Sequence, residues 1–467
     1  MKETSLQDLD RRSVLHPVTS VDEQQRLGPR VFAAASGCRV TDINGREFLD
    51  LGAGLWCVNV GYGREVLADV ARAATRDLSY FYSFGAAANV PMIQLADHVL
   101  RLLAHDAGIA DLARVFFGCS GSDANDTAYK LVKYYNNVQG RPRKKKIVSR
   151  LGAYHGSSFA SGSLTGIGSY HAAFDQPLPD VLHVSCPHHY RFARDGESPE
   201  QFGRRLVDEI SALIEREGAE TVAAFIAEPI MGTGGVLLPP PGYFEGVSEL
   251  LRRHDILLIV DEVITGFGRT GRWFGSELYG LQPDILSFAK GLTSGYFPLS
   301  ATVISERVWQ VLRDASPTMG TFMHGFTYTG HPVGCAIALA NLDIVEREGL
   351  VHRAAEMGDY LLRGLRERLA DSPFVGDIRG EGLLAAVELV ADRTTRRFFR
   401  NGQGPHQVVA RQATANGLLV RALPFIDVNS FSPPFTISRA EIDEGVERYG
   451  RALDEARPAL EHLAAAA

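Results

Sequence analysis

The fold is decided by the stretch Ile256-Leu257-Leu258-Ile259-Val260-Asp261-Glu262. Its five consecutive apolar residues are typical of a strand that is buried on both faces of a parallel sheet. Asp261 follows at the carboxyl end of the strand, which is the edge where open α/β sheets bind their ligands. A carboxylate there can accept a hydrogen bond from a protonated ring nitrogen, although a strand-end aspartate often only caps the next turn.

A second strand of this kind ends in a lysine, in the run Asp284-Ile285-Leu286-Ser287-Phe288-Ala289-Lys290-Gly291-Leu292. Burial disfavours an ammonium group and favours the free amine, which is a nucleophile toward aldehydes. A strand-end lysine can instead extend its charge into solvent. The pairing of Lys290 with Asp261 on neighbouring strands favours the chemical role.

A third pattern predicts an anion site. The strand Val115-Phe116-Phe117 is followed by the turn Gly118-Cys119-Ser120-Gly121-Ser122 and then by a helical pattern of apolar residues. A glycine turn at a helix N-terminus offers backbone N–H groups and hydroxyls to a phosphate, although similar turns also cap ordinary helices. The turn is not a Walker A loop, because no Gly-Lys-Ser/Thr follows. It is not a nucleophile elbow either, because Cys119 stands where that motif needs glycine.

Further motifs follow in order along the chain. They are Gly54-Leu55-Trp56-Cys57-Val58-Asn59-Val60-Gly61-Tyr62-Gly63, Tyr154-His155-Gly156, Glu228-Pro229, Asp261-Glu262-Val263-Ile264-Thr265-Gly266-Phe267-Gly268-Arg269-Thr270-Gly271 and His324-Gly325-Phe326-Thr327-Tyr328-Thr329-Gly330-His331-Pro332. With the three patterns above, they make the chain resemble the class III pyridoxal-phosphate aminotransferases, in their omega-transaminase branch. The resemblance runs from about Leu15 to the C-terminal region.

The resemblance implies an α/β protein with the pyridoxal 5′-phosphate (PLP)-dependent transferase fold of type I. Its large domain would hold a mostly parallel seven-stranded sheet, and a smaller α+β domain would follow. We expect an N-terminal segment at residues 1–58 that joins the small domain, a PLP-binding domain at 59–330 and a C-terminal domain at 331–467. A hairpin turning at Asn44-Gly45 is predicted in the first segment.

The resemblance also implies a role for each matching residue. Lys290 would form the Schiff base with PLP and shuttle the proton, and Asp261 would pair with the pyridine nitrogen. Thr327 would reach the phosphate of the neighbouring subunit. Glu228 would support the polar edge of the cofactor, although it could equally be an acid that ends the strand 222–226. The remaining cofactor-binding residues would be Ser120, Gly121, Ser122, Tyr154, His155 and Val263.

The substrate would be bound by Trp56, Phe84, Tyr154 and Arg421. In this branch the matching arginine grips the carboxylate of a keto acid or amino acid and moves aside for an amine without one, and a guanidinium suits a planar carboxylate. A surface arginine and a core tryptophan are the ordinary alternatives for Arg421 and Trp56.

The implied activity is ping-pong transamination from an amine or omega-amino acid to a keto acid such as pyruvate. Aminomutases and decarboxylases of the same fold use the same lysine and aspartate, so they are the alternatives within the fold. Leu55-Trp56 and Arg421 favour the transaminase, because they match its substrate pocket. A nucleotide-binding or hydrolase protein is disfavoured, because the Walker lysine and the nucleophile elbow are missing.

The composition and charge of the chain agree with an enzyme that acts on small molecules. The 467 residues carry a formal net charge of −7, which argues against a nucleic-acid partner. The cysteines and histidines show no metal-ligand spacing, and no apolar run predicts a signal peptide or a membrane span. We therefore expect a cytoplasmic enzyme without a metal. The resemblance implies a homodimer or a tetramer of dimers with shared active sites.

Three positions predict a roomier amine pocket than in similar enzymes. Val18 and Gly85 stand where aromatic residues are common, and Ser169 aligns with a position that is often tyrosine. The neighbouring Tyr170 could replace that tyrosine through a one-residue shift, and other side chains could refill the space.

Overall fold

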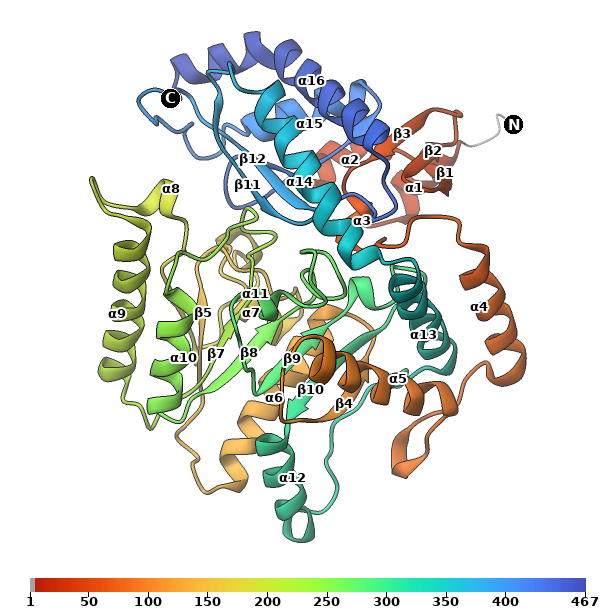
Figure 1. The fold of residues 1–467 in the computed structure, drawn as a ribbon, viewed down its shortest axis with the longest axis vertical. Helices are drawn as coiled ribbons and strands as arrows, with labels where there is room; N and C mark the ends of the chain where they lie inside the picture. The colour runs from red at the N-terminus through yellow and green to blue at the C-terminus, as the bar shows by residue number, and fades with distance from the viewer. Residues whose placement is uncertain (1–4) are drawn as a thin grey trace.

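A seven-stranded sheet forms the centre of the larger part of the molecule in the computed structural model, which describes residues 5–467 (Figure 1). In the order β4-β10-β9-β8-β7-β5-β6, β10 runs antiparallel to both neighbours and the other pairs are parallel. The strands are β4 (Leu112–Gly118), β10 (Ser300–Ser305), β9 (Ile285–Phe288), β8 (Leu257–Asp261), β7 (Val222–Ala227), β5 (Lys146–Arg150) and β6 (Val181–Val184). The prediction of a mostly parallel seven-stranded sheet is confirmed.

Helices cover both faces of this sheet, which explains why its central strands are apolar without alternation. Every residue of β7, β8 and β9 is buried. One face packs on α5 (Val90–Arg101), α9 (Pro199–Glu217) and α10 (Tyr243–Arg253), and the other packs on α6 (Gly121–Val138) and α12 (Glu306–Met319). The remaining helices of this part are α4 (Glu65–Leu78), α7 (Phe159–Leu164), α8 (His189–Phe192), α11 (Gly275–Leu278) and α13 (Pro332–Arg347).

The C-terminal part lies over one end of the large sheet, shown in blue in Figure 1. Its antiparallel sheet has the order β11-β12-β15-β14 and is backed by helices. These elements are α14 (Leu350–Arg368), β11 (Val375–Glu381), β12 (Leu384–Leu389), α15 (Pro405–Ala415), β14 (Arg421–Ala422), β15 (Val428–Phe431) and α16 (Arg439–Ala465).

The N-terminal segment joins this C-terminal part through strand pairing. The hairpin β2 (Arg39–Asp42) and β3 (Glu47–Asp50) forms as predicted, with Gly45 at a φ of 77° in its turn. The strand β13 (Leu418–Leu419) pairs in parallel with β3. The segment also holds α1 (Leu6–Ser13), α2 (Val21–Leu27), β1 (Phe32–Ser36) and α3 (Ala53–Trp56).

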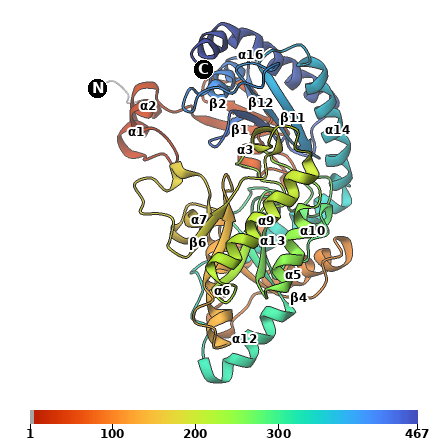
Figure 2. The same ribbon diagram turned by 90° about the vertical axis from the view of Figure 1, so that its left-hand side faces the viewer.

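The domain boundaries at residues 58 and 330 stay predictions. Helix α13 follows the second boundary and packs against α4 and α5 of the larger part. Figure 2 shows α1 and α2 standing off to one side of the molecule. None of the helices within residues 5–467 has the length and apolar character needed to cross a bilayer.

Candidate active site

A cavity of about 320 Å³ opens beside the carboxyl ends of β8 and β9, the edge that the sequence patterns predict. It brings together nine predicted residues from five separate stretches of chain. They are Ser120, Gly121, Ser122, Tyr154, His155, Glu228, Asp261, Val263 and Lys290. Apolar side chains, including Leu55, Ile230 and Phe297, complete the wall.

Lys290 begins a short 3₁₀ turn just after β9. Its φ of 42° lies in the left-handed region, which few non-glycine residues adopt outside functional or tightly constrained sites. Burial lowers the pKa of the Lys290 ammonium from its ordinary value of 10.5. The amine is therefore more readily available as a free base than a lysine in water.

The Asp261 carboxylate is held from three sides. Oδ2 accepts hydrogen bonds from Asn125 Nδ2 at 2.7 Å and from His155 Nδ1 at 2.8 Å, and Oδ1 accepts one from the Val263 backbone at 3.0 Å. Asn125 was not predicted from the sequence. It stands one helical turn after Gly121 on α6, so the same helix face carries both, and this spacing is the signal that would have indicated it.

The turn for which an anion site is predicted leads into the N-terminus of α6. Ser120 and Asp123 close a capping box, in which the Ser120 hydroxyl accepts from the Asp123 backbone at 3.3 Å. The first N–H groups of a helix have no partner inside it, which leaves those of Gly121 and Ser122 free of intrahelical bonds. A Cβ at Gly121 would lie 3.0 Å from Val263, so a larger residue would press on that side chain.

Glu228 is a buried acid in the wall of the cavity. Its Oε1 accepts from the Tyr154 backbone at 3.2 Å, and its Oε2 accepts from the Gly232 backbone at 2.9 Å. Burial raises the pKa of this carboxyl group. Glu228 therefore fixes the main chain of Tyr154, whose ring lines the cavity.

Arg421 and Trp56 form one stacked pair. The guanidinium carbon lies 4.1 Å from the centre of the Trp56 ring, and Lys290 Nζ lies 5.9 Å from the same centre. Arg421 Nη1 is buried and has no hydrogen-bond partner among residues 5–467. Burial lowers the pKa of Arg421, so an anionic group beside it would relieve an unpaired buried charge.

Four predicted residues do not line this cavity. Arg421 lines a second pocket together with Asp50 and Tyr62, and Trp56 is buried beside Arg421. The other two, Thr327 and Phe84, lie on the exposed surface. Thr327 is exposed, and its backbone oxygen accepts from the Tyr80 hydroxyl at 2.8 Å. Phe84 is 51% exposed and contacts Gly325 in the same surface segment.

None of the three positions that predict a roomy pocket lines the cavity of its own chain. Val18 is 81% exposed, Ser169 is exposed, and a side chain at Gly85 would meet nothing within 4 Å. The Tyr170 ring packs edge-to-face on Tyr154 with 5.3 Å between the ring centres. The roomy pocket stays a prediction.

The comparison with protein families shows the family to which the chain belongs. The family described as "Aminotransferase class-III" matches residues 20–453. This chain is a class III aminotransferase.

Relatives of this aminotransferase cover nearly its whole length. The diaminobutyrate–2-oxoglutarate transaminase of Halomonas elongata is 43% identical, covering 97% of this chain and 96% of that protein. A chloroplastic gamma aminobutyrate transaminase of Solanum lycopersicum is 41% identical, covering 98% and 87% respectively. The omega transaminase of Pseudomonas jessenii, solved in complex with PMP, is 43% identical with a TM-score of 0.94, covering 98% of this chain and 99% of that one. The PLP-dependent fold of type I is thus established.

Class III aminotransferases use PLP, and the cavity fits that cofactor. The helix N-terminus at Gly121 suits its phosphate, and the Asp261 carboxylate suits its pyridinium nitrogen. A buried amine at Lys290 suits its aldehyde, while Tyr154 and Val263 offer flat or apolar contacts to a ring.

Proposed function

We propose that this aminotransferase moves an amino group from an amine or omega-amino acid to a keto acid such as pyruvate. The observation that carries the proposal is Arg421, whose buried Nη1 has no partner among residues 5–467 and whose guanidinium stacks on Trp56. A fixed guanidinium recognises a planar carboxylate through two parallel N–H donors. The apolar residues Leu55, Ile230 and Phe297 favour an amine with an uncharged substituent.

Each residue then has a distinct task. PLP, when bound, supplies an aldehyde for a primary amine and a cationic ring that accepts electrons. Lys290 Nζ acts as the base that takes a proton from the substrate carbon and returns it, which its lowered pKa favours. Asp261 keeps the ring cationic, and Asn125 and His155 keep Asp261 in place. Arg421 orients the carboxylate of the keto acid.

A second copy of the chain would complete the site. Thr327 and Phe84 lie on an exposed surface together with an unusual number of apolar side chains, and contiguous apolar patches mark interfaces. The exposed members of this patch are Tyr80, Phe81, Tyr82, Phe84, Met323 and Tyr328. We propose a homodimer in which Thr327 reaches the cofactor phosphate of the partner subunit.

Replacement of Arg421 by leucine tests the proposal. We expect the KM for pyruvate to rise at least tenfold, while the half-reaction with isopropylamine, which has no carboxylate, keeps its rate. The loss of a charge-assisted pair at a buried site has about this size. The assay should also include 2-oxoglutarate and 4-aminobutyrate, because relatives are named for such substrates. An unchanged KM for every keto acid would contradict the role of Arg421.

A further inference from the structure

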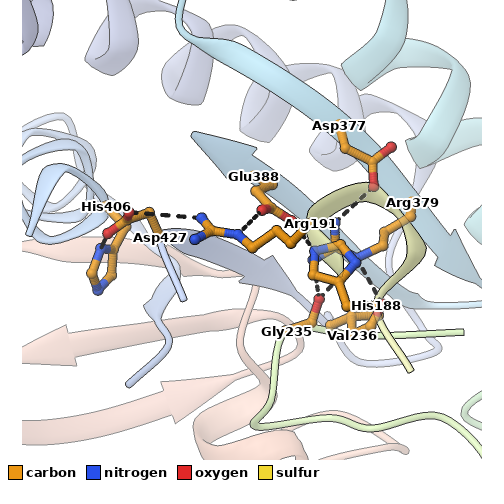
Figure 3. A network of polar contacts seen from close by, with 9 residues as sticks. All are labelled: His188, Arg191, Gly235, Val236, Asp377, Arg379, Glu388, His406 and Asp427. Carbon is orange, nitrogen blue, oxygen red and sulfur yellow. Dashed lines mark hydrogen bonds and ion pairs between the residues drawn. The ribbon is translucent and has the colours of Figure 1, made fainter. Parts of the chain in front are cut away.

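A buried network of charged side chains joins the C-terminal part of the chain to the large sheet region (Figure 3). Its centre is Glu388 on β12, whose side chain is 0% exposed. The Glu388 carboxylate accepts from His188 Nε2 at 2.8 Å and from Arg379 Nη1 at 2.6 Å, and it also contacts Arg191. His188 and Arg191 belong to the large part, whereas Glu388 and Arg379 belong to the small sheet. We call these four residues the Glu388 network.

The charges of the network are balanced inside the protein. Burial opposes ionisation of Glu388, but Arg379, His188 and Arg191 together outweigh the effect of burial and hold the pKa of Glu388 well below its usual value. Asp377 pairs with Arg379 at 2.7 Å, and Asp427 lies 3.7 Å from Arg191. Removing one member therefore leaves a buried charge without its partner, and the surrounding elements must shift to compensate.

Arg379 extends the network to the wall of the active site. Its Nε donates to the backbone oxygens of Gly235 and Val236 at 3.0 Å each, and its Nη2 donates to Gly235 at 2.6 Å. The loop that holds Gly235 begins at Glu228 and Ile230, which line the cavity. The network thus fixes a loop of the active site as well as the small sheet.

The same small sheet carries Arg421. Glu388 on β12 pairs with Val428 on β15, and Ser430 on β15 lies opposite both Ala386 and Arg421. Arg421 is therefore two hydrogen-bonded strands away from the network on one continuous sheet. A shift of β12 against the large part would move Arg421 relative to Lys290, which lies on the other side of the junction.

We propose that the Glu388 network positions Arg421 and so sets the affinity of the enzyme for substrate carboxylates. Glu388 is then a positioning residue for specificity, and this inference rests on the proposed role of Arg421. If Glu388 had a purely structural role, its replacement would lower the stability of the protein and weaken the binding of all substrates alike. The two roles differ in how carboxylated and carboxylate-free substrates respond.

The experiment compares the holoenzyme with its Glu388→Gln variant. We expect the dissociation constant of propionate, measured by titration calorimetry, and the KM for pyruvate to rise roughly tenfold, as for residues coupled through a shared backbone shift. The KM for isopropylamine should stay within about twofold, because that substrate does not use Arg421. Leu460→Ala, which removes a buried side chain of α16, is the control for lost stability. It should lower Tm without separating the two substrates.

Combining Glu388→Gln with Arg421→Leu tests whether Glu388 affects propionate binding through Arg421. If Glu388 acts through Arg421, the double variant Glu388→Gln/Arg421→Leu has the same propionate affinity as Arg421→Leu alone. Additive effects, or an equal change for isopropylamine and pyruvate, would overturn the inference. Should Glu388→Gln not fold, Asp427→Asn at the rim of the network must show a smaller shift in the same direction, and no shift would overturn it. If Arg421→Leu itself leaves propionate binding unchanged, the proposed function fails instead.

Discussion

At the scale of single residues, the hydrogen bonds to Asp261 predict how strongly two substitutions lower kcat. Loss of the Asp261 charge should cost more than loss of one group that donates to it. Replacing Asp261 by asparagine removes the charge, and we expect a loss of roughly 10²–10³-fold in kcat, the size typical of lost electrostatic contacts in active sites. Replacing Asn125 by alanine removes one hydrogen bond to that charge, and we expect about a tenfold loss. Stopped-flow absorbance of the amine half-reaction measures both, and an Asn125→Ala variant as slow as Asp261→Asn would contradict this order.

The lowered pKa of Lys290 predicts a pH dependence. As pH falls through this pKa, Nζ takes a proton and stops being a nucleophile, so the rate of PLP capture by the cofactor-free protein rises with pH. Because burial lowers the pKa, the rate should level off clearly below pH 10.5, the ordinary value for lysine. Nα-acetyllysine is the control, since its rate should rise until near its ordinary pKa. Parallel profiles for the protein and the control would contradict the burial of Lys290.

Nine of the predicted site residues line one cavity. They could be predicted because the pattern that indicates each of them is local in the sequence. A strand-end charge or a glycine turn before a helix can be read from a few neighbouring residues. The spacing of Asn125 from Gly121 indicates only the helix face on which it lies, because its role depends on a hydrogen bond to Asp261, 136 positions away. The stacking of Arg421 on Trp56 likewise requires two distant segments to meet.

At the scale of elements, the tip of the hairpin that joins β14 to β15 packs against two glycines of the large part. A Cβ at Gly152 would lie 2.5 Å from the Phe425 ring, and one at Gly235 would lie 2.6 Å from Ile426. Both glycines have a positive φ, of 84° and 130°. These contacts dock the C-terminal sheet on the large part, next to the Tyr154 segment.

Gly152→Ala should therefore destabilise the protein more than backbone strain alone would. Gly140→Ala is the matched control, because Gly140 also has a positive φ but meets nothing within 4 Å. We expect about 1 kcal/mol for the control, from the left-handed backbone, and a further ~1–3 kcal/mol for Gly152→Ala, from overpacking. Urea unfolding measures both changes, and equal values would show that the hairpin tip does not press on Gly152.

The elements differ in how well the sequence predicts them. Strand β7 is apolar throughout, β8 is apolar up to Asp261, and β9 is interrupted only by Ser287, so these strands and the parallel sheet could be predicted. The strands β13 and β14 have only two residues each, which is too short for any periodicity. Their pairing depends on tertiary contacts that no local pattern contains.

At the scale of the whole molecule, the exposed patch around Thr327 predicts a site shared between two subunits. A mixed dimer of two variants that are inactive alone, Lys290→Ala and Thr327→Asp, should then be active. In a Lys290→Ala subunit Thr327 is intact, and in a Thr327→Asp subunit Lys290 is intact. If the partner's Thr327 completes each site, random pairing of the two gives about a quarter of the wild-type activity, because half of the dimers contain one complete site. Light scattering should report a dimer. No recovery on mixing and refolding would contradict a shared site.

The central claim is that Lys290 holds the cofactor and yields it to a donor amine. Borohydride reduction of the holoenzyme followed by peptide mass spectrometry tests this directly. We predict a pyridoxyl group on Lys290, and its near-complete loss when the enzyme is first incubated with a donor amine in the absence of a keto acid. A label on another residue, or a Lys290 label that no amine in a panel including isopropylamine and 4-aminobutyrate removes, would contradict the account.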